Sequence, residues 1–146
     1  MTMTNAAETA FLNLFFLNTD WANVGDAAGL QNSAAAGSFY ISLHTADPGE
    51  TGTQTTSEAN YTGYARVAVA RTSGGFTVSG NNASNTAAVT FGACTAGSST
   101  VTYFGIGSDS TGTGNLFMSG ALTASLAVTT GITPSFAIGE MDINAD

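Results

Sequence analysis

The sequence contains no lysine, so Arg66 and Arg71 are its only permanently cationic side chains. Charged residues make up 8% of the 146 residues, with a formal net charge of −8, whereas an average soluble domain has roughly 25% charged residues. Nucleic-acid binding needs cationic side chains that displace counterions from phosphate, and docking on an anionic membrane needs them too. We therefore expect no nucleic-acid partner and no membrane partner.

Cysteine and histidine each occur once. Cys94 cannot form an intramolecular disulfide, so the fold must be stabilised by packing or by oligomerisation. Because Cys94 ends an apolar run, we predict a buried small hydrophobic residue rather than a reactive thiol. His44 lies at the end of a predicted strand, on the face opposite the apolar side chains, and we predict an exposed or hydrogen-bonded structural histidine.

The sequence has few of the residues that catalysis or metal binding requires. It lacks a Gly-x-Ser-x-Gly elbow, and a zinc site needs several histidine or cysteine ligands. Asp47 and Glu50 could imitate a glycosidase pair, but they flank a Pro-Gly turn and are predicted to be solvated. Gly105 and Gly107 have the spacing of a phosphate loop without its lysine or its helix. We predict a non-enzymatic protein with no catalytic residues, no metal site and no cofactor.

Long hydrophobic runs are missing as well. The longest, Phe11 to Leu17, is too short to cross a bilayer. The first residues, Met1 to Asn5, contain no cation and so do not resemble a secretory signal. We expect synthesis in a cytoplasm without export.

With so few charges, the surface must consist mainly of serine, threonine, asparagine, glycine and alanine. Such a surface loses little hydration energy when a neighbour covers it, and salt has little to screen on it. Both properties suit a subunit of a protein shell. A compositional bias of the genome is the alternative explanation.

Residues 1–37 are predicted to form a helix followed by a loop. Asn5 is the expected N-cap, with Glu8 three residues later as in a capping box. Phe11 and Phe15 fall on one apolar face, which must pack on its own domain or on a neighbouring subunit. The loop that follows is expected to be anchored by Trp21.

From residue 38 to residue 146 the apolar residues alternate with a period of two, which is typical of strands. A strand over 101–106 has two apolar faces and is expected to be central. A β-bulge at 139–140 would keep the last strand on one face. About eight short strands separated by turn signals predict a mainly β, single-domain β-sandwich or jelly roll with a short N-terminal helix. The strands are expected within residues 39–43, 64–71, 76–78, 87–91, 101–106, 116–122, 126–128 and 136–143.

Nearly the whole chain carries stretches that are familiar in their order. They are Thr4–Leu17, Phe39–Gly49, Tyr64–Val67, Val101–Gly107, Ser119–Thr123 and Gly131–Phe136. In these stretches the chain resembles a family of small structural proteins of tailed bacteriophages and prophages, often labelled tail fibre proteins. The resemblance implies a likeness to capsid cement proteins, which have a β-sandwich fold, lie on the outer shell where capsomers meet and commonly form trimers.

We therefore expect a capsid decoration (cement) protein of the virion, made in the bacterial host cytoplasm. It would bind the major capsid protein on the outer surface of the head, self-associate as a homotrimer, and bridge capsomers. The alternative is a tail fibre or tail-associated receptor-binding module. The N-terminal segment Met1–Asn18 and the loop Thr45–Asn60 are the expected contacts, and the two arginines are expected to pair with carboxylates in this subunit or the next. The candidate contact residues are Asn5, Phe11, Phe15, Trp21, Asp47, Glu50, Arg66 and Arg71.

Overall fold

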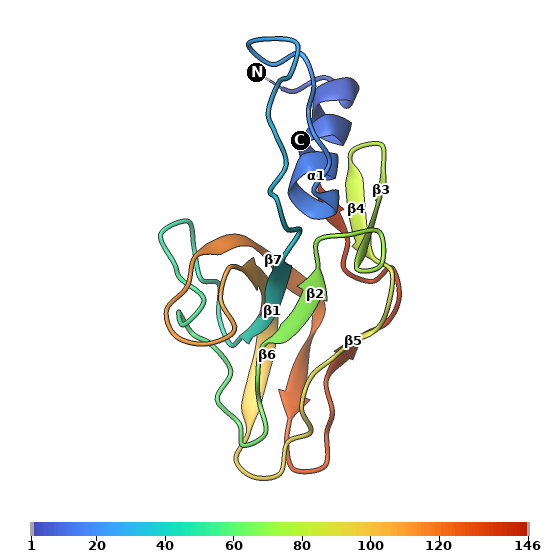
Figure 1. Cartoon of the computed structure of the whole chain (residues 1–146). Helices are drawn as coiled ribbons and strands as arrows, with labels where there is room; N and C mark the ends of the chain where they lie inside the picture. Colours follow the sequence, from blue (N-terminus) through green and yellow to red (C-terminus); the bar gives the residue numbers. More distant parts are fainter. Residues whose placement is uncertain (1, 146) are drawn as a thin grey trace. The chain divides into compact units, whose positions relative to one another are not determined.

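The computed structural model describes residues 2–145 (Figure 1). Antiparallel sheets and one short N-terminal helix make the fold mainly β and of the β-sandwich type, which confirms the predicted fold class. The chain forms two compact units. The first consists of the residues up to 38, 70–89 and those from 136 on, and the second consists of 39–69 and 90–135. Two later segments join the N-terminal one in the first unit, and the predicted division at residue 37 stays a prediction.

In the first unit, helix α1 (Asn5–Leu17) has a suitable capping residue at each end. Thr4 is the N-cap, and its Oγ1 accepts a hydrogen bond from the N–H of Ala7 at 3.4 Å. The prediction of Asn5 as the cap is wrong by one residue, since Asn5 already belongs to the first turn. The helix ends at Asn18, whose φ of 53° is a left-handed conformation that asparagine tolerates.

The helix packs on a sheet of its own unit. Leu12 and Phe16 are fully buried, and the ring of Phe16 lies 4.8 Å from that of Phe76 between centroids. Full burial of one such side chain stabilises the fold by about 1.5–3 kcal/mol. Of the two packing partners considered for the helix, the structure shows the chain's own sheet. That sheet contains β3 (Phe76–Ser79), β4 (Asn82–Asn85) and β9 (Ile143–Asn144), in this order.

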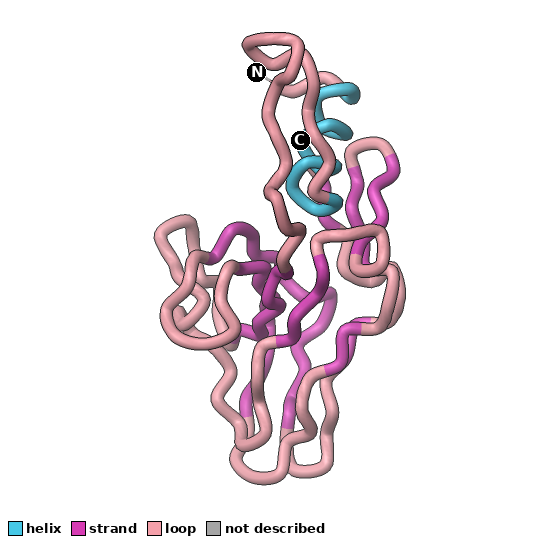
Figure 2. The backbone as a smooth tube through the Cα atoms, in the orientation of Figure 1, coloured by secondary structure: helices cyan, strands magenta, loops and turns pink. Residues whose placement is uncertain are grey.

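The loop between α1 and β1 turns back on itself (Figure 2). Trp21 and Leu30 exchange two backbone hydrogen bonds of 2.9 Å each, and the predicted anchoring by the Trp21 side chain stays a prediction. Nearer the helix, the side-chain amide of Asn18 donates to Ser33 O and accepts from Ser33 N, both at 2.9 Å. The C-cap of α1 therefore also fixes the return of the loop.

The second unit is built on a four-stranded antiparallel sheet in which β6 is central, as predicted. Ile106 of β6 faces Ile41 on one side and Met118 on the other. Val101 and Ile106, which alternate onto opposite faces of β6, are both fully buried, which accounts for its two apolar faces. The order of the strands is β2 (Val67–Ala70), β1 (Ser38–His44), β6 (Ser99–Gly107) and β7 (Leu116–Val128).

Strand β7 is one long strand where the sequence predicted two. Val101 pairs with Leu126 and Tyr103 pairs with Ala121, so β7 uses more residues than β6 over the same distance. The extra residues form a bulge around 122–125, which interrupts the alternation that the sequence shows. The predicted gap between two strands is therefore an irregularity within one.

Two other predictions differ from the structure. Residues 82–85 form β4, a strand that the sequence did not predict, because its polar residues hide the alternation. Gly139 has a φ of 76° and lies in a turn closed by Glu140 N–H donating to Ala137 O at 3.2 Å. The predicted bulge is thus a turn. It separates two pairs of short strands, β5 (Val89–Thr90) with β8 (Ser135–Phe136) and β4 with β9.

Candidate functional site

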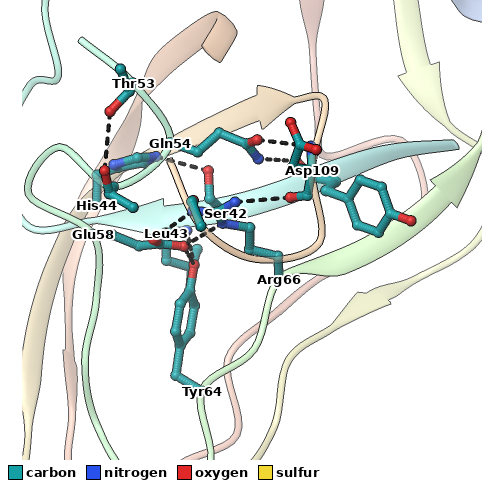
Figure 3. A network of polar contacts seen from close by, with 12 residues as sticks. Ser42, Leu43, His44, Thr53, Gln54, Glu58, Tyr64, Arg66 and Asp109 are labelled. Carbon is teal, nitrogen blue, oxygen red and sulfur yellow. Dashed lines mark hydrogen bonds and ion pairs between the residues drawn. The ribbon is translucent and has the colours of Figure 1, made fainter. Parts of the chain in front are cut away.

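A network of polar side chains in the second unit is centred on an ion pair between Arg66 and Glu58 (Figure 3). Arg66 Nε donates to Glu58 Oε1 at 2.7 Å and Nη2 donates to Oε2 at 2.9 Å, so the contact is bidentate. The side chains are only 3% and 16% exposed, respectively. This hydrogen bonding raises the pKa of the Arg66 guanidinium, because the carboxylate stabilises its charged form.

The guanidinium of Arg66 also connects two loops. Nη1 donates to Asp109 O at 2.9 Å and Nη2 donates to Gly112 O at 2.7 Å. Glu58 lies in the loop after β1, and the two carbonyls lie in the hairpin between β6 and β7. The sequence left open whether Arg66 pairs within its own subunit, and the structure shows that it does. Its role as a contact with another protein stays a prediction.

Tyr64 is the third side chain of this cluster. Its hydroxyl donates to Glu58 Oε1 at 2.8 Å and accepts from Leu43 N–H at 3.1 Å. Burial raises the pKa of Tyr64 well above its ordinary value, and the neighbouring Glu58 carboxylate raises it further. The ring stacks on Phe91 and meets Tyr61 edge-on. Tyr64 therefore joins the polar network to the apolar core.

Ser42 and His44 form a second hydrogen-bonded group on β1. The Oγ of Ser42 lies 2.8 Å from Nε2 of His44, and Nδ1 lies 2.8 Å from Thr56 O. A carbonyl oxygen can only accept, so Nδ1 carries the proton and Nε2 accepts from the serine hydroxyl. Burial lowers the pKa of His44 and favours this neutral form. Of the two predicted descriptions of His44, hydrogen-bonded fits and exposed does not.

This pair has the spacing of a nucleophile and its general base, but substrate has no route to it. Ser42 and His44 are both fully buried. A Cβ added at Gly105 on β6 would lie 2.8 Å from Ser42 Oγ and 2.7 Å from His44 Nε2. The neighbouring strand thus covers the pair, and the arrangement fixes the loop that carries Thr56. Sequence analysis did not single out Ser42, although its i, i+2 spacing to His44 on one strand is the signal that points to it.

Gln54 is the third buried polar side chain of the network. Its Oε1 accepts from Asp109 N–H at 2.9 Å, and its Nε2 donates to Tyr40 O at 3.4 Å. A Cβ at Gly107 would lie 2.1 Å from Gln54 Cδ, and one at Gly114 would lie 2.1 Å from Oε1. The glycines at 105 and 107 therefore make room for buried polar side chains. Their spacing has this structural cause and is not that of a phosphate loop.

A hollow of about 360 Å³ lies beside this network at the surface of the second unit. It is bordered by Asp47 and Glu50 on one side and by the first residues of β7 on the other. Phe117 is 45% exposed and contacts Phe39 edge-on. Asp47 Oδ1 accepts from Gly49 N–H at 2.9 Å, which fixes the turn. As predicted, both carboxylates are exposed.

The other predicted contact residues belong to the first unit. Asn5 is exposed on the first turn of α1. Phe11 and Phe15 stack at 5.7 Å and are half-buried, as is Trp21. Part of the apolar helix face therefore stays accessible beside the buried Leu12. Whether a partner contacts these residues stays a prediction, and Met1 of the expected contact segment lies outside the described residues.

Arg71 closes the C-terminal end of α1. Its Nε donates to Phe15 O at 2.7 Å and its Nη2 donates to Leu14 O at 3.0 Å. Its Nη1 donates to Ala36 O at 3.1 Å. A cation at this end of a helix satisfies carbonyls that lack an intrahelical partner and interacts favourably with the helix dipole. The sequence predicted a carboxylate partner for Arg71, and the structure adds these carbonyl partners.

Three further observations concern sites elsewhere. Cys94 is buried, as predicted, with its Sγ near the carbonyls of Ala96 and Gly97. Within residues 2–145, no group of three or more histidine, cysteine or acidic side chains is placed to hold a metal ion. No helix in the described part of the chain is both long and apolar enough to span a membrane.

Comparison with known proteins identifies the class of molecule. The family described as Podophage GP4 fiber I protein gp80 matches residues 2–144. The chain belongs to this family. It is therefore a structural protein of a bacteriophage virion, as its resemblance to small tailed-phage proteins indicated. A search of curated proteins found no match to the chain.

Proposed function

We propose that the protein is a non-catalytic building block of a tail-associated fibre and works by surface contacts with other virion proteins. The observation that carries this proposal is the family match, which spans residues 2–144 and bears the description of a fibre protein. Sequence analysis placed this function second, after capsid decoration.

The polar network of the second unit supports a structural role. The buried ion pair of Arg66 with Glu58 and further hydrogen bonds hold the loop after β1 and the β6–β7 hairpin together. Such contacts fix the shape of a binding surface in advance, which lowers the entropy lost on assembly. The one serine–histidine pair of the network is buried, which favours a structural rather than a catalytic use.

Capsid decoration is the second candidate. The low fraction of charged residues, 8%, favours it, because covering a polar uncharged surface costs little desolvation free energy at each of many repeated contacts. The absence of a long repetitive shaft sequence also favours it. In this case the protein would bind the major capsid protein on the outer capsid surface as a homotrimer.

The copy number per purified particle separates the two functions. Quantitative mass spectrometry of virions, calibrated against the major capsid protein, is the measurement. A fibre subunit should be present in tens of copies or fewer, and gold-labelled antibody should bind at the tail. Hundreds of copies with label spread over the head would reject the fibre and establish decoration.

A further inference from the structure

The outermost strand of the four-stranded sheet presents an open edge. β7 is the last strand in the order β2-β1-β6-β7, and its residues 116–121 pair with 103–107 of β6, with a register shift at Phe117. The main chain of an edge strand offers hydrogen-bonding groups to another chain.

This edge lacks two of the devices by which natural sheets avoid pairing, although it has bulges. Residues 116–121 contain no charged residue and no proline. The register with β6 shifts at Phe117 and again after Ala121, so the regular part of this edge is residues 118–121, a length within the range of short strands. Phe117 leaves 45% of its surface exposed here. An edge with this sequence is suited to receive a strand.

The acidic hollow lies at the start of the same edge. The loop after β1 pairs with the chain as far as Asn115, where Thr53 forms an isolated bridge. Beyond that point the loop and the strand are separated by the hollow, which is lined by Asp47, Glu50 and residues 116–119. Two exposed carboxylates beside an aromatic face suit the cationic end of a lysine or arginine side chain.

The charge of this chain argues for a different protein as the source of that cation. The chain has no lysine. Arg66 binds Glu58 and two carbonyls, and Arg71 binds carbonyls at the end of α1. A second copy therefore brings eight further net negative charges and two arginines that are already engaged.

We propose that residues 116–121 of β7 pair with an extended segment of another virion protein, and that a lysine or arginine of this segment lies in the hollow beside Asp47 and Glu50. This deepens the proposed function, on which it rests for the class of partner. A positively charged strand gains main-chain hydrogen bonds along the edge and a charge contact at its start. The charge contact selects among strands, because every strand offers the same main chain.

The test uses the full-length protein and two ten-residue peptides of alternating valine and threonine, one with a central lysine and one with a central glutamate. Amide hydrogen exchange followed by NMR reports on residues 116–121. The lysine peptide should slow exchange there and bind at least about fivefold more tightly than the glutamate peptide at low salt. The double variant Asp47→Asn, Glu50→Gln should remove this difference, and Glu140→Gln, an exposed carboxylate of the first unit, should leave it.

Three results would overturn the proposal. They are equal binding of the two peptides, no protection of residues 116–121 by either, and protection without peptide that grows with protein concentration. The last would assign the edge to a second copy of this chain. Copy number and labelling of the particle do not depend on this edge. If the peptides fail to bind, the fibre proposal is unaffected. If the copy number rejects the fibre, the strand-pairing result is unaffected.

Discussion

Replacing Arg66 by methionine should destabilise the protein more than any other single change of a charged residue. Methionine keeps most of the aliphatic bulk but loses the guanidinium, which is 3% exposed. Glu58 then retains Tyr64 as a donor, and the carbonyls of Asp109 and Gly112 lose theirs. Removing one partner of a buried ion pair costs about 3–5 kcal/mol. We expect about 3 kcal/mol, because Glu58 keeps some contact with water.

Urea unfolding at pH 7, followed by circular dichroism, measures this loss. The pair Arg66→Met and Glu58→Gln forms a double-mutant cycle, in which the combined variant should lose about 1–2 kcal/mol less than the sum of the single losses. Glu140→Gln is the control and should change stability by about 0.5 kcal/mol or less. A loss below about 1 kcal/mol for Arg66→Met that disappears in high salt would refute the reasoning, since exposed pairs behave in this way.

Three further predictions concern positions that the structure explains individually. Gly107→Ala should cost about 1–3 kcal/mol in urea unfolding, because its Cβ would meet Gln54 at 2.1 Å, whereas Gly74→Ala should be nearly neutral. Burial lowers the pKa of His44, so its contribution to stability should be complete above about pH 6.5 and decline as the pH falls below that value. His44→Gln should flatten this decline in the urea midpoint, and an unchanged slope would contradict it. Thr4→Ala should lower the stability measured by thermal unfolding by about 1 kcal/mol, and Asn5→Ala should lower it clearly less. A larger loss for Asn5→Ala would show that Asn5 is the N-cap.

Alternating apolar residues were sufficient to predict the mainly β fold and the central strand. The apolar residues of β6 fall on both faces of the strand. This pattern predicted a central strand, and β6 lies between β1 and β7. β4 was missed because only Ala83 and Asn85 are buried on it, and buried asparagine leaves no hydrophobic period. β7 was divided because a bulge shifts its register, and periodicity alone does not distinguish a bulge from a gap.

The polar network was harder to predict because its contacts join residues from different loops. Arg66 was singled out from composition, but its partner Glu58 is eight residues away in a loop that lacks a regular period. Gln54 is buried although it is polar, and only the glycine at 107 shows why it fits. These contacts depend on how the loop between β1 and β2 meets the β6–β7 hairpin, which local sequence patterns do not encode.

The serine and histidine of β1 show why distance alone does not establish an active site. Their separation of 2.8 Å, with His44 oriented by Thr56 O, satisfies the geometry of a nucleophile and its base. Catalysis also needs space for a reacting group near Ser42 Oγ. That space would open only if β6 moved away from β1, because the backbone at Gly105 lies against both side chains. The hydrogen bonds of the pair instead hold Thr56 in place, and Thr56 lies in the same loop as Glu58, so the pair supports the ion pair between Glu58 and Arg66.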